Sequence, residues 1–210
     1  AAATGKALTR SATTGVNNDQ GWLTTDVGRI VKFNGGTAKI TARTNSTVAV
    51  ATIVDAFTNT DATVAFQLGS FSDTNGFPSS VSFFEQRLVF SATNDQPQTI
   101  FFSKSGDYEN MSAGTNDDDA MVYTIASNQV NAIKSMKATR TLIVMTTGGE
   151  YSVSAGNASA ITPTNISIVK QSNYGSAGVD ALSIGNATIF LQRAKRKIRE
   201  LAYNFDTDGY

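Results

Sequence analysis

Apolar positions along this chain mostly alternate with polar ones, or gather in short runs that end at Gly, Asn, Asp or Ser. Alternation over about four to eight residues predicts half-buried β-strands, whereas a helix repeats its apolar positions roughly every 3.6 residues. Segments with the helical period are hard to find. The pattern therefore predicts an all-β protein of short strands joined by polar turns.

Residues 1–70 carry five predicted strands. They lie near Leu8 and at 30–33, 38–42, 47–53 and 64–68. Asn34-Gly35-Gly36 separates two of them and is a strong turn sequence. A five-strand unit of this size suits a small β-barrel, and we assign 1–70 to such a domain. The segment 69–78, "GSFSDTNGFP", is rich in turn residues and predicts a joint.

Residues 71–210 repeat one pattern three times: a short strand, a polar turn and a longer apolar strand. The repeats begin with "VSFFEQRLVFSA", "AIKSMKATRTLIVMTT" and "ALSIGNATIFLQ". Their most apolar strands centre on Val89, Ile143 and Phe190, about 50 residues apart, which is close to the period of propeller blades. Since these strands are apolar on both faces, we expect neighbouring sheets to cover them.

The predicted fold is a small N-terminal barrel followed by β-propeller-like antiparallel sheets. About three blades make an incomplete ring, because propellers usually have about four to eight. We therefore expect the chain to be a piece of a longer protein.

The amino-acid composition excludes several kinds of catalytic and binding site. Lys plus Arg and Asp plus Glu each number 17, which argues against a general nucleic-acid binder. There is no His and no Cys, so disulfides, Ser-His-Asp triads and Cys-His proteases are excluded. No apolar run approaches the roughly 18 residues of a membrane span. We expect a protein with no membrane span, no enzyme activity, no cofactor and no metal.

Four blocks of the sequence together resemble a known family. In order they are "DVGRIVKFNGGTAKITA", "FPSSVSFFEQRLVFSATNDQPQTIFFSKSGDYEN", "DDDAMVYTIASNQVNAI" and "TPTNISIVKQSNYGSAGVDALSIGNATIFLQRAKRKIRELAYNFDTDGY". They resemble a tail protein encoded by many phages and prophages, similar to the nozzle or tubular proteins of short-tailed phages. The similarity runs from about Leu8 to Tyr210.

The resemblance implies a non-enzymatic structural protein of the virion tail, made in the cytoplasm of the bacterial host. It implies other tail proteins as partners and a homo-oligomeric ring in the full-length protein. In this family the first segment is likened to the first catalytic-cysteine half-domain of ubiquitin-activating enzymes. That likeness concerns fold alone, since this chain has no cysteine. The alternatives are a carbohydrate- or receptor-binding module at the tail tip, and a tail-associated glycosidase.

Asp117, Asp118 and Asp119 form the densest acidic cluster and are the candidate metal ligands, because Ca²⁺ and Mg²⁺ prefer carboxylate oxygens. No calcium-loop spacing surrounds them. The other interpretation, which we favour, is a solvated turn before a strand at 121–125.

Lys195, Arg196 and Lys197 form the centre of a basic cluster that also includes Arg193 and Arg199. One interpretation is contact with a partner or with phosphates, such as DNA passing through a tail lumen. The favoured one is a hairpin turn at a sheet edge, where cations oppose aggregation. Strand alternation would place Lys195, Lys197 and Arg199 on one solvent face.

A glycosidase needs two carboxyl groups that converge in a pocket. Glu85 and Glu150 occupy similar-looking places in two repeats, which indicates architecture more than an active site. Alternation predicts that most aromatic side chains are buried between sheets, and that Trp22 plugs one end of the barrel.

The loop Asp26-Val27-Gly28-Arg29 is either a binding loop or the means by which the barrel turns a corner. We favour the corner. Asp26 would accept backbone N–H groups in its own turn, and Arg29 would brace Asp26 or an edge carbonyl.

Overall fold

The computed structural model describes residues 4–127, 130–156 and 158–204. In this part of the chain the fold is all-β, with sixteen strands and one short 3₁₀ helix, η1 (Thr24–Asp26). The chain divides into two compact units, Ala1–Phe77 and Pro78–Tyr210. The division lies inside the turn-rich segment 69–78. Each unit is described by itself.

The first unit is one antiparallel sheet with the strand order β1-β4-β3-β2-β5. Its strands are β1 (Lys6–Thr9), β2 (Ile30–Phe33), β3 (Gly36–Arg43), β4 (Val48–Asp55) and β5 (Phe66–Leu68). The five predicted strands are thus confirmed. No pairing between the edge strands β1 and β5 is found among the described residues, so a closed barrel is not identified.

Alternation gives this sheet its core. Val31, Ile40 and Ala49 point to the same side and are buried together with Val16 and Trp22. Trp22 is only 3 % exposed and packs in this core. That it plugs one end of a barrel stays a prediction. The Asn34-Gly35 turn between β2 and β3 is also confirmed. Both residues have positive φ, 45° and 72°, as a two-residue hairpin turn of the primed type requires.

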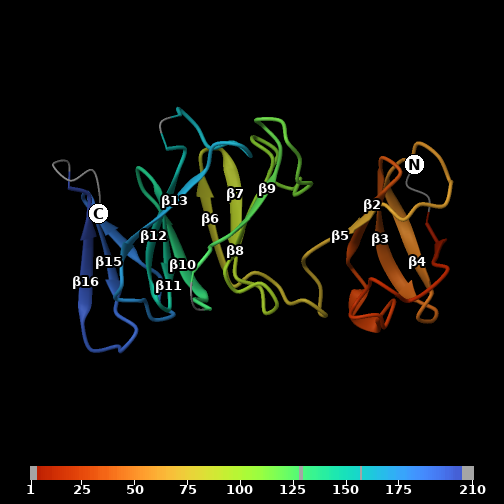
Figure 1. Ribbon diagram of the computed structural model, residues 1–210, viewed down its shortest axis with the longest axis horizontal. Coiled ribbons are helices and arrows are strands. Elements are labelled where there is room, and N and C mark those ends of the chain that lie inside the picture. Colours follow the sequence, from red (N-terminus) through yellow and green to blue (C-terminus); the bar gives the residue numbers. More distant parts are fainter. Residues whose placement is uncertain (1–3, 128–129, 157, 205–210) are drawn as a thin grey trace. The chain divides into compact units, whose positions relative to one another are not determined.

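The second unit consists of three antiparallel sheets (Figure 1). The first sheet contains β6 (Ser80–Phe84), β7 (Arg87–Ser91), β8 (Thr99–Phe102) and β9 (Met121–Thr124). The second contains β10 (Ile133–Ala138), β11 (Leu142–Thr146), β12 (Gly149–Ser154) and β13 (Ser167–Ser172). The third contains β14 (Leu182–Ile184), β15 (Ala187–Leu191) and β16 (Ile198–Ala202). In each of these three sheets the strands pair in chain order.

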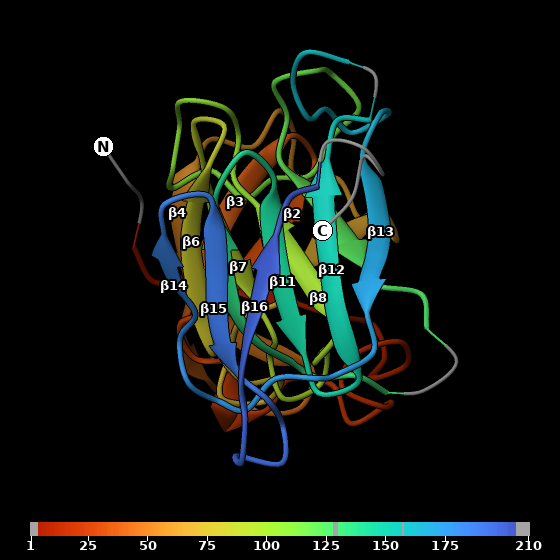
Figure 2. The same ribbon diagram turned by 90° about the vertical axis from the view of Figure 1, so that its left-hand side faces the viewer.

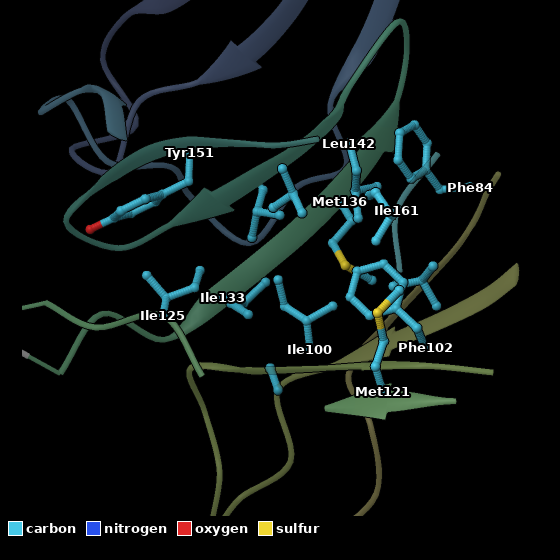
Figure 3. Packing of buried hydrophobic residues seen from close by; sticks show 14 of the residues in the cluster. Phe84, Ile100, Phe102, Met121, Ile125, Ile133, Met136, Leu142, Tyr151 and Ile161 are labelled. Atoms are coloured by element: carbon cyan, nitrogen blue, oxygen red, sulfur yellow. The ribbon is translucent and has the colours of Figure 1, made fainter. Parts of the chain in front are cut away.

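The predicted repeat therefore corresponds to three successive sheets, and Val89, Ile143 and Phe190 lie on the second strand of each. Leu142 and Val144 of β11 pack in one core with residues of the first sheet, including Ile100 and Phe102 (Figure 3). Ile143 and Met145 point the other way and pack with Phe190 and Leu201 of the third sheet. Successive side chains of a strand alternate between faces, so β11 is covered by a sheet on both sides.

β7 and β15 differ from the expectation that neighbouring sheets cover both faces of the most apolar strands. β11 is buried at every position, but β7 and β15 are only partly covered on their outward sides. On the outward face of the third sheet Leu182, Ile184 and Ile198 are exposed. Full burial of an inner strand needs a sheet on each face, and among the described sheets of this unit, taken by itself, the middle one has a neighbour on both faces. A closed propeller is not identified.

Candidate functional site

The acidic loop 117–119 is organised by a buried arginine. Arg87, at the start of β7, is 3 % exposed and points to the same side as Val89. Its guanidinium donates hydrogen bonds to the carbonyl oxygens of Ser103 (2.8 Å), Asp117 (2.7 Å) and Asp119 (2.7 Å). Burial lowers the pKa of Arg87, and Asp118, Glu85 and Asp119 oppose this change. The loop thus takes its shape from main-chain bonds to one cation.

The carboxylates of this loop have cationic and amide partners. Nζ of Lys104 lies 2.8 Å from Oδ2 of Asp118 and 3.7 Å from Oδ1 of Asp119. The hydrogen bond from Lys104 lowers the pKa of Asp118, and the same bond raises the pKa of Lys104. Oδ2 of Asp119 accepts from the main-chain and side-chain nitrogens of Asn116, both at 3.0 Å. This arrangement agrees with a solvated turn before β9.

The same loop borders a hollow of about 410 Å³. Its carboxylate-bearing lining residues are Glu85, Asp117 and Asp118, all of them exposed. The structure does not bring Asp117, Asp118 and Asp119 into a metal centre: no group of three or more His, Cys, Asp or Glu with suitable geometry occurs among residues 4–127, 130–156 and 158–204.

Glu85 and Glu150 do not occupy equivalent places, so that part of the sequence interpretation is wrong. Glu85 lies in the β6–β7 turn with φ 46°, and its Oε2 accepts a hydrogen bond from Ile161 N at 2.6 Å. Glu150 lies inside β12 and is fully buried. Hairpin turns and strand interiors follow each other closely in a meander, so residues near a turn in sequence end in different environments.

Glu150 is the most unusual carboxyl group of the described chain. It accepts a hydrogen bond from the hydroxyl of Ser172, while its Oε1 has no hydrogen-bond partner among the described residues. Burial raises the pKa of Glu150, and the bond from Ser172 opposes the rise. Its pairing opposite Met145 places it on the side of β12 that faces the third sheet.

Lys195, Arg196 and Lys197 lie in the turn between β15 and β16 and are all exposed. Lys195 N donates to Gln192 O (2.7 Å) and Gln192 N donates to Lys197 O (2.9 Å), which closes the turn. The structure thus brings these three cations together at the end of a hairpin.

Arg199 does not belong with them. It lies on β16, half buried, with its guanidinium carbon 4.0 Å from the ring centre of Tyr174 and its Nε donating to Gln192. Only side chains inside a regular strand alternate, and Lys195 and Lys197 precede β16. The expectation of one shared solvent face is therefore wrong for Arg199.

Burial of the aromatic side chains is less general than alternation predicts: the buried ones among the described residues are Trp22, Phe84, Phe101, Phe102, Tyr151 and Phe190. Phe83 on β6 is 61 % exposed and meets Tyr108 edge to face with 5.4 Å between ring centroids. Tyr108 is also exposed. Phe205 lies outside the described residues.

The Asp26–Arg29 loop is a closed structural network. Oδ2 of Asp26 accepts from Leu23 N (2.8 Å), and Arg29 donates from Nη1 to Oδ1 of Asp26 (2.9 Å) and from Nε to the carbonyl of Gly69 (2.7 Å). Asp26 is thus bonded to a backbone N–H in its own turn, and Arg29 braces both Asp26 and the carbonyl that follows β5. The predicted contacts of Asp26 and Arg29 are confirmed, and the role of the loop as a corner of a barrel stays a prediction.

Sequence reasoning missed Arg87, Lys104 and Glu150 as organising residues. A signal was present for two of them. Arg87 and Glu150 each occupy the inward position of an alternating strand, where a charge is costly unless it is compensated. Lys104 gave no such signal, because its partners are about 14 residues away along the chain.

No protein-family model matches this chain, and neither does any curated protein. The described part of the chain contains no helix with the length and apolar character needed to cross a bilayer.

Proposed function

We propose that this chain is a non-enzymatic structural component of a phage tail that assembles with other tail proteins. The resemblance of its sequence blocks to tail nozzle or tubular proteins suggests the setting. The architecture of the second unit supports the proposed role in assembly. Between its three sheets, apolar faces are buried by sheet-on-sheet packing, and surfaces of separate proteins can associate in the same way.

One observation carries the proposal. The middle sheet is covered on both sides, whereas the outward face of the third sheet exposes Leu182 (64 %), Ile184 (62 %) and Ile198 (74 %). Clustered exposed apolar side chains are typical of interaction surfaces. An assembling protein accounts for this face better than an isolated monomer does.

The finer fold belongs to the same proposal. We propose that the first unit is a small barrel-like domain and that the three sheets are blades of a propeller-type ring. Their meander order, their face-to-face stacking and the repeat of about 50 residues support the second point. In the full-length protein we expect a homo-oligomeric ring, located in the virion tail.

The proposal includes no chemistry. Without His and Cys, catalysis would depend on carboxylates, Lys, Tyr or a Ser-Lys pair. Of the carboxylates at the hollow, Asp118 has a lowered pKa, which is opposite to what a glycosidase acid needs. The exposed turn Lys195–Lys197 is a contact site for a partner, or for DNA if the chain lines a tail lumen.

Electron microscopy of the full-length protein, with size-exclusion chromatography and light scattering, tests this function. Rings or tubes, and labelling of the tail in purified virions, are the expected results. A strictly monomeric protein that is absent from virions would overturn the proposal.

A second candidate is carbohydrate binding at the tail tip. It is favoured by the exposed Phe83–Tyr108 pair, because sugars bind on exposed aromatic rings that lie beside polar groups. Binding to a glycan array that is lost in Phe83→Ala, but kept in a matched Val81→Ala variant of the same strand, would establish it. Glycan binding unchanged by Phe83→Ala would exclude this pair as the platform.

A further inference from the structure

Glu150 lies where the second and third sheets pack together. Figure 2 looks through the third sheet onto the second, with β15 and β16 in front of β11 and β12. Glu150 is fully buried and is paired with Met145, which shares a core with Phe190 and Leu201 of the third sheet. Burial removes the hydration of a carboxyl group, and this is costly when the group is charged.

Only one oxygen of this carboxyl group has a hydrogen-bond partner. The hydroxyl of Ser172 donates to Oε2 of Glu150, whereas Oε1 is buried without a partner among the described residues. The main-chain N–H groups of Tyr174 and Gly175 lower the pKa of Glu150, but burial raises it more. A neutral carboxyl group tolerates this environment at lower cost than a carboxylate, because an unpaired buried charge carries the larger desolvation penalty.

Lys170 of β13 acts on Glu150 from the other face of the second sheet. It pairs with Tyr151, the next residue of β12, and successive side chains of a strand point to opposite faces. Its Nζ lies 5.9 Å from the centre of the Tyr151 ring. The charge of Lys170 lowers the pKa of Glu150, but this effect is smaller than that of burial.

Two further cations point toward the interface between the second and third sheets. Lys137 of β10 pairs with Ile143, a residue of the core between these sheets. Arg199 of β16 pairs with Phe190 of the same core, and its guanidinium carbon lies 4.0 Å from the ring centre of Tyr174. The other charged side chains of the facing segments are exposed: Lys134, Asp180 and Arg193. Among the described residues none of these cations forms an ion pair with the buried carboxyl group, so its charge would stay uncompensated.

The crossover segment, residues 173–177, fastens the third sheet to the second. The N–H of Ser176 donates to the carbonyl of Thr146 at the end of β11 (2.7 Å). The N–H of Ala177 donates to the carbonyl of Leu191 at the end of β15 (2.9 Å). One short segment is therefore hydrogen-bonded to both sheets.

The crossover segment is also held close to Glu150. Gly175 has φ 70°, and a Cβ at this position would collide with the carbonyl of Thr147, so the chain needs glycine here. The N–H groups of Tyr174 and Gly175 lie near enough to the carboxyl group of Glu150 to affect its pKa. A charge on Glu150 thus acts on the segment that joins the two sheets.

We infer that Glu150 is a proton-operated switch for the packing of the crossover segment and the third sheet on the second sheet. The neutral carboxyl group keeps this packing closed, and loss of its proton opens the packing so that water reaches the carboxylate. The core between the first and second sheets lies on the opposite face of the second sheet, so it does not need to open. The switch goes beyond the proposed assembly function and does not rest on it.

The test is NMR amide hydrogen exchange of the full chain, measured from the ordinary pKa of glutamate to the pH at which the carboxyl carbon signal of Glu150 stops titrating. Rates are corrected for the pH dependence of chemical exchange. The opening equilibrium constant of amides in the crossover segment and β14–β16 should then increase about tenfold for each pH unit between the ordinary and the raised pKa, and should level off above it. Amides of β6–β9 are the internal control and should show no such increase.

Three variants separate the switch from a merely structural role. Glu150→Gln has no proton to lose, so exchange in the third sheet should lose this pH dependence. Glu200→Gln, at an exposed position of β16, is the matched control and should keep it. Ser172→Ala removes a hydrogen bond that favours the charged form, so the upper end of the transition should move to higher pH.

Three results would overturn the inference. They are a carboxyl carbon signal of Glu150 that titrates at the ordinary pKa of glutamate, an unchanged pH dependence of third-sheet exchange in Glu150→Gln, and an equal increase of exchange in β6–β9. Circular dichroism and thermal unfolding show whether each variant is folded. If Glu150→Gln does not fold, the carboxyl titration of the unmodified chain and the shift in Ser172→Ala decide the matter.

Discussion

Asp26 and Arg29 form a buried ion pair, with 2.9 Å between Nη1 of Arg29 and Oδ1 of Asp26. Asp26 is fully buried and Arg29 is 5 % exposed. Asn17 donates to the second carboxylate oxygen of Asp26, and Thr74 donates to the first. The pair joins the continuous segment formed by η1 and the loop before β2 to the chain after β5, through the bond from Arg29 to Gly69, 40 residues further along the sequence.

Removing one partner of this pair should be costly. In Asp26→Ala the Arg29 guanidinium remains buried without its counter-charge, so we expect a loss of about 3–5 kcal/mol in the free energy of unfolding. Urea unfolding followed by Trp22 fluorescence measures it. The exposed Asp61→Ala is the matched control, with an expected change below about 0.5 kcal/mol. The double variant Asp26→Ala with Arg29→Met should lose less than the two single variants added together, and simple additivity would contradict the coupling.

Arg87 should be needed for the shape of the acidic loop. Arg87→Met leaves the carbonyl groups of Ser103, Asp117 and Asp119 without their donor, and we expect a loss of about 3 kcal/mol with faster proteolysis at 115–119. Lys104→Met removes two ion pairs of a partly exposed side chain and should destabilise the protein much less than Arg87→Met does. Equal effects of the two variants would show that the loop does not depend on the buried arginine.

Glu150 should make stability depend on pH. Burial raises its folded-state pKa above the ordinary value, so the folded state binds the proton more tightly than the unfolded state. Stability should therefore rise as pH falls from the raised pKa to the ordinary one, with the full penalty present above the raised pKa. Glu150→Gln should be more stable than the unmodified chain above the raised pKa, because the amide carries no charge to bury.

The difference between Glu150→Gln and the unmodified chain should disappear below the ordinary pKa of glutamate. Unfolding free energies measured for both proteins across this range check it. A Glu150→Gln profile parallel to that of the unmodified chain would show that Glu150 does not titrate in this way.

Ile143 should hold the second and third sheets together. It is fully buried between them, so Ile143→Ala should cost about 2–5 kcal/mol and should increase amide exchange in β14–β16. Ile198→Ala, at a 74 % exposed position, should change stability by less than about 0.5 kcal/mol. Exchange in the third sheet that is unaffected by Ile143→Ala would contradict its role at this interface.

Local pattern predicted the strands well where one face is apolar. β2, β3, β4, β7, β11 and β15 all lie where alternation or a short apolar run placed them. β13 was missed, because "SIVKQS" has no clean alternation and is held by β12 through a bulged register.

The candidate sites also divide into those that local sequence predicts and those that depend on contacts between distant segments. The basic turn was recognised as a hairpin end, because its location depends only on the strands beside it. The partners of Asp118 and the burial of Arg87 and Glu150 were not predicted, since they depend on contacts with segments distant in sequence. Arg199 was misplaced because regular alternation was extended across a turn.

The sequence by itself determined the all-β class, the five-strand first unit, the three repeats and the two-residue Asn34-Gly35 turn. These depend on side-chain periodicity and backbone preference, which act over a few residues. Only the tertiary structure decided which faces are covered and which charges are buried. Burial and electrostatic partners are properties of packed sheets. The apolar side chains of β11 are all buried because a sheet lies on both of its faces, whereas the apolar side chains of β14 are exposed.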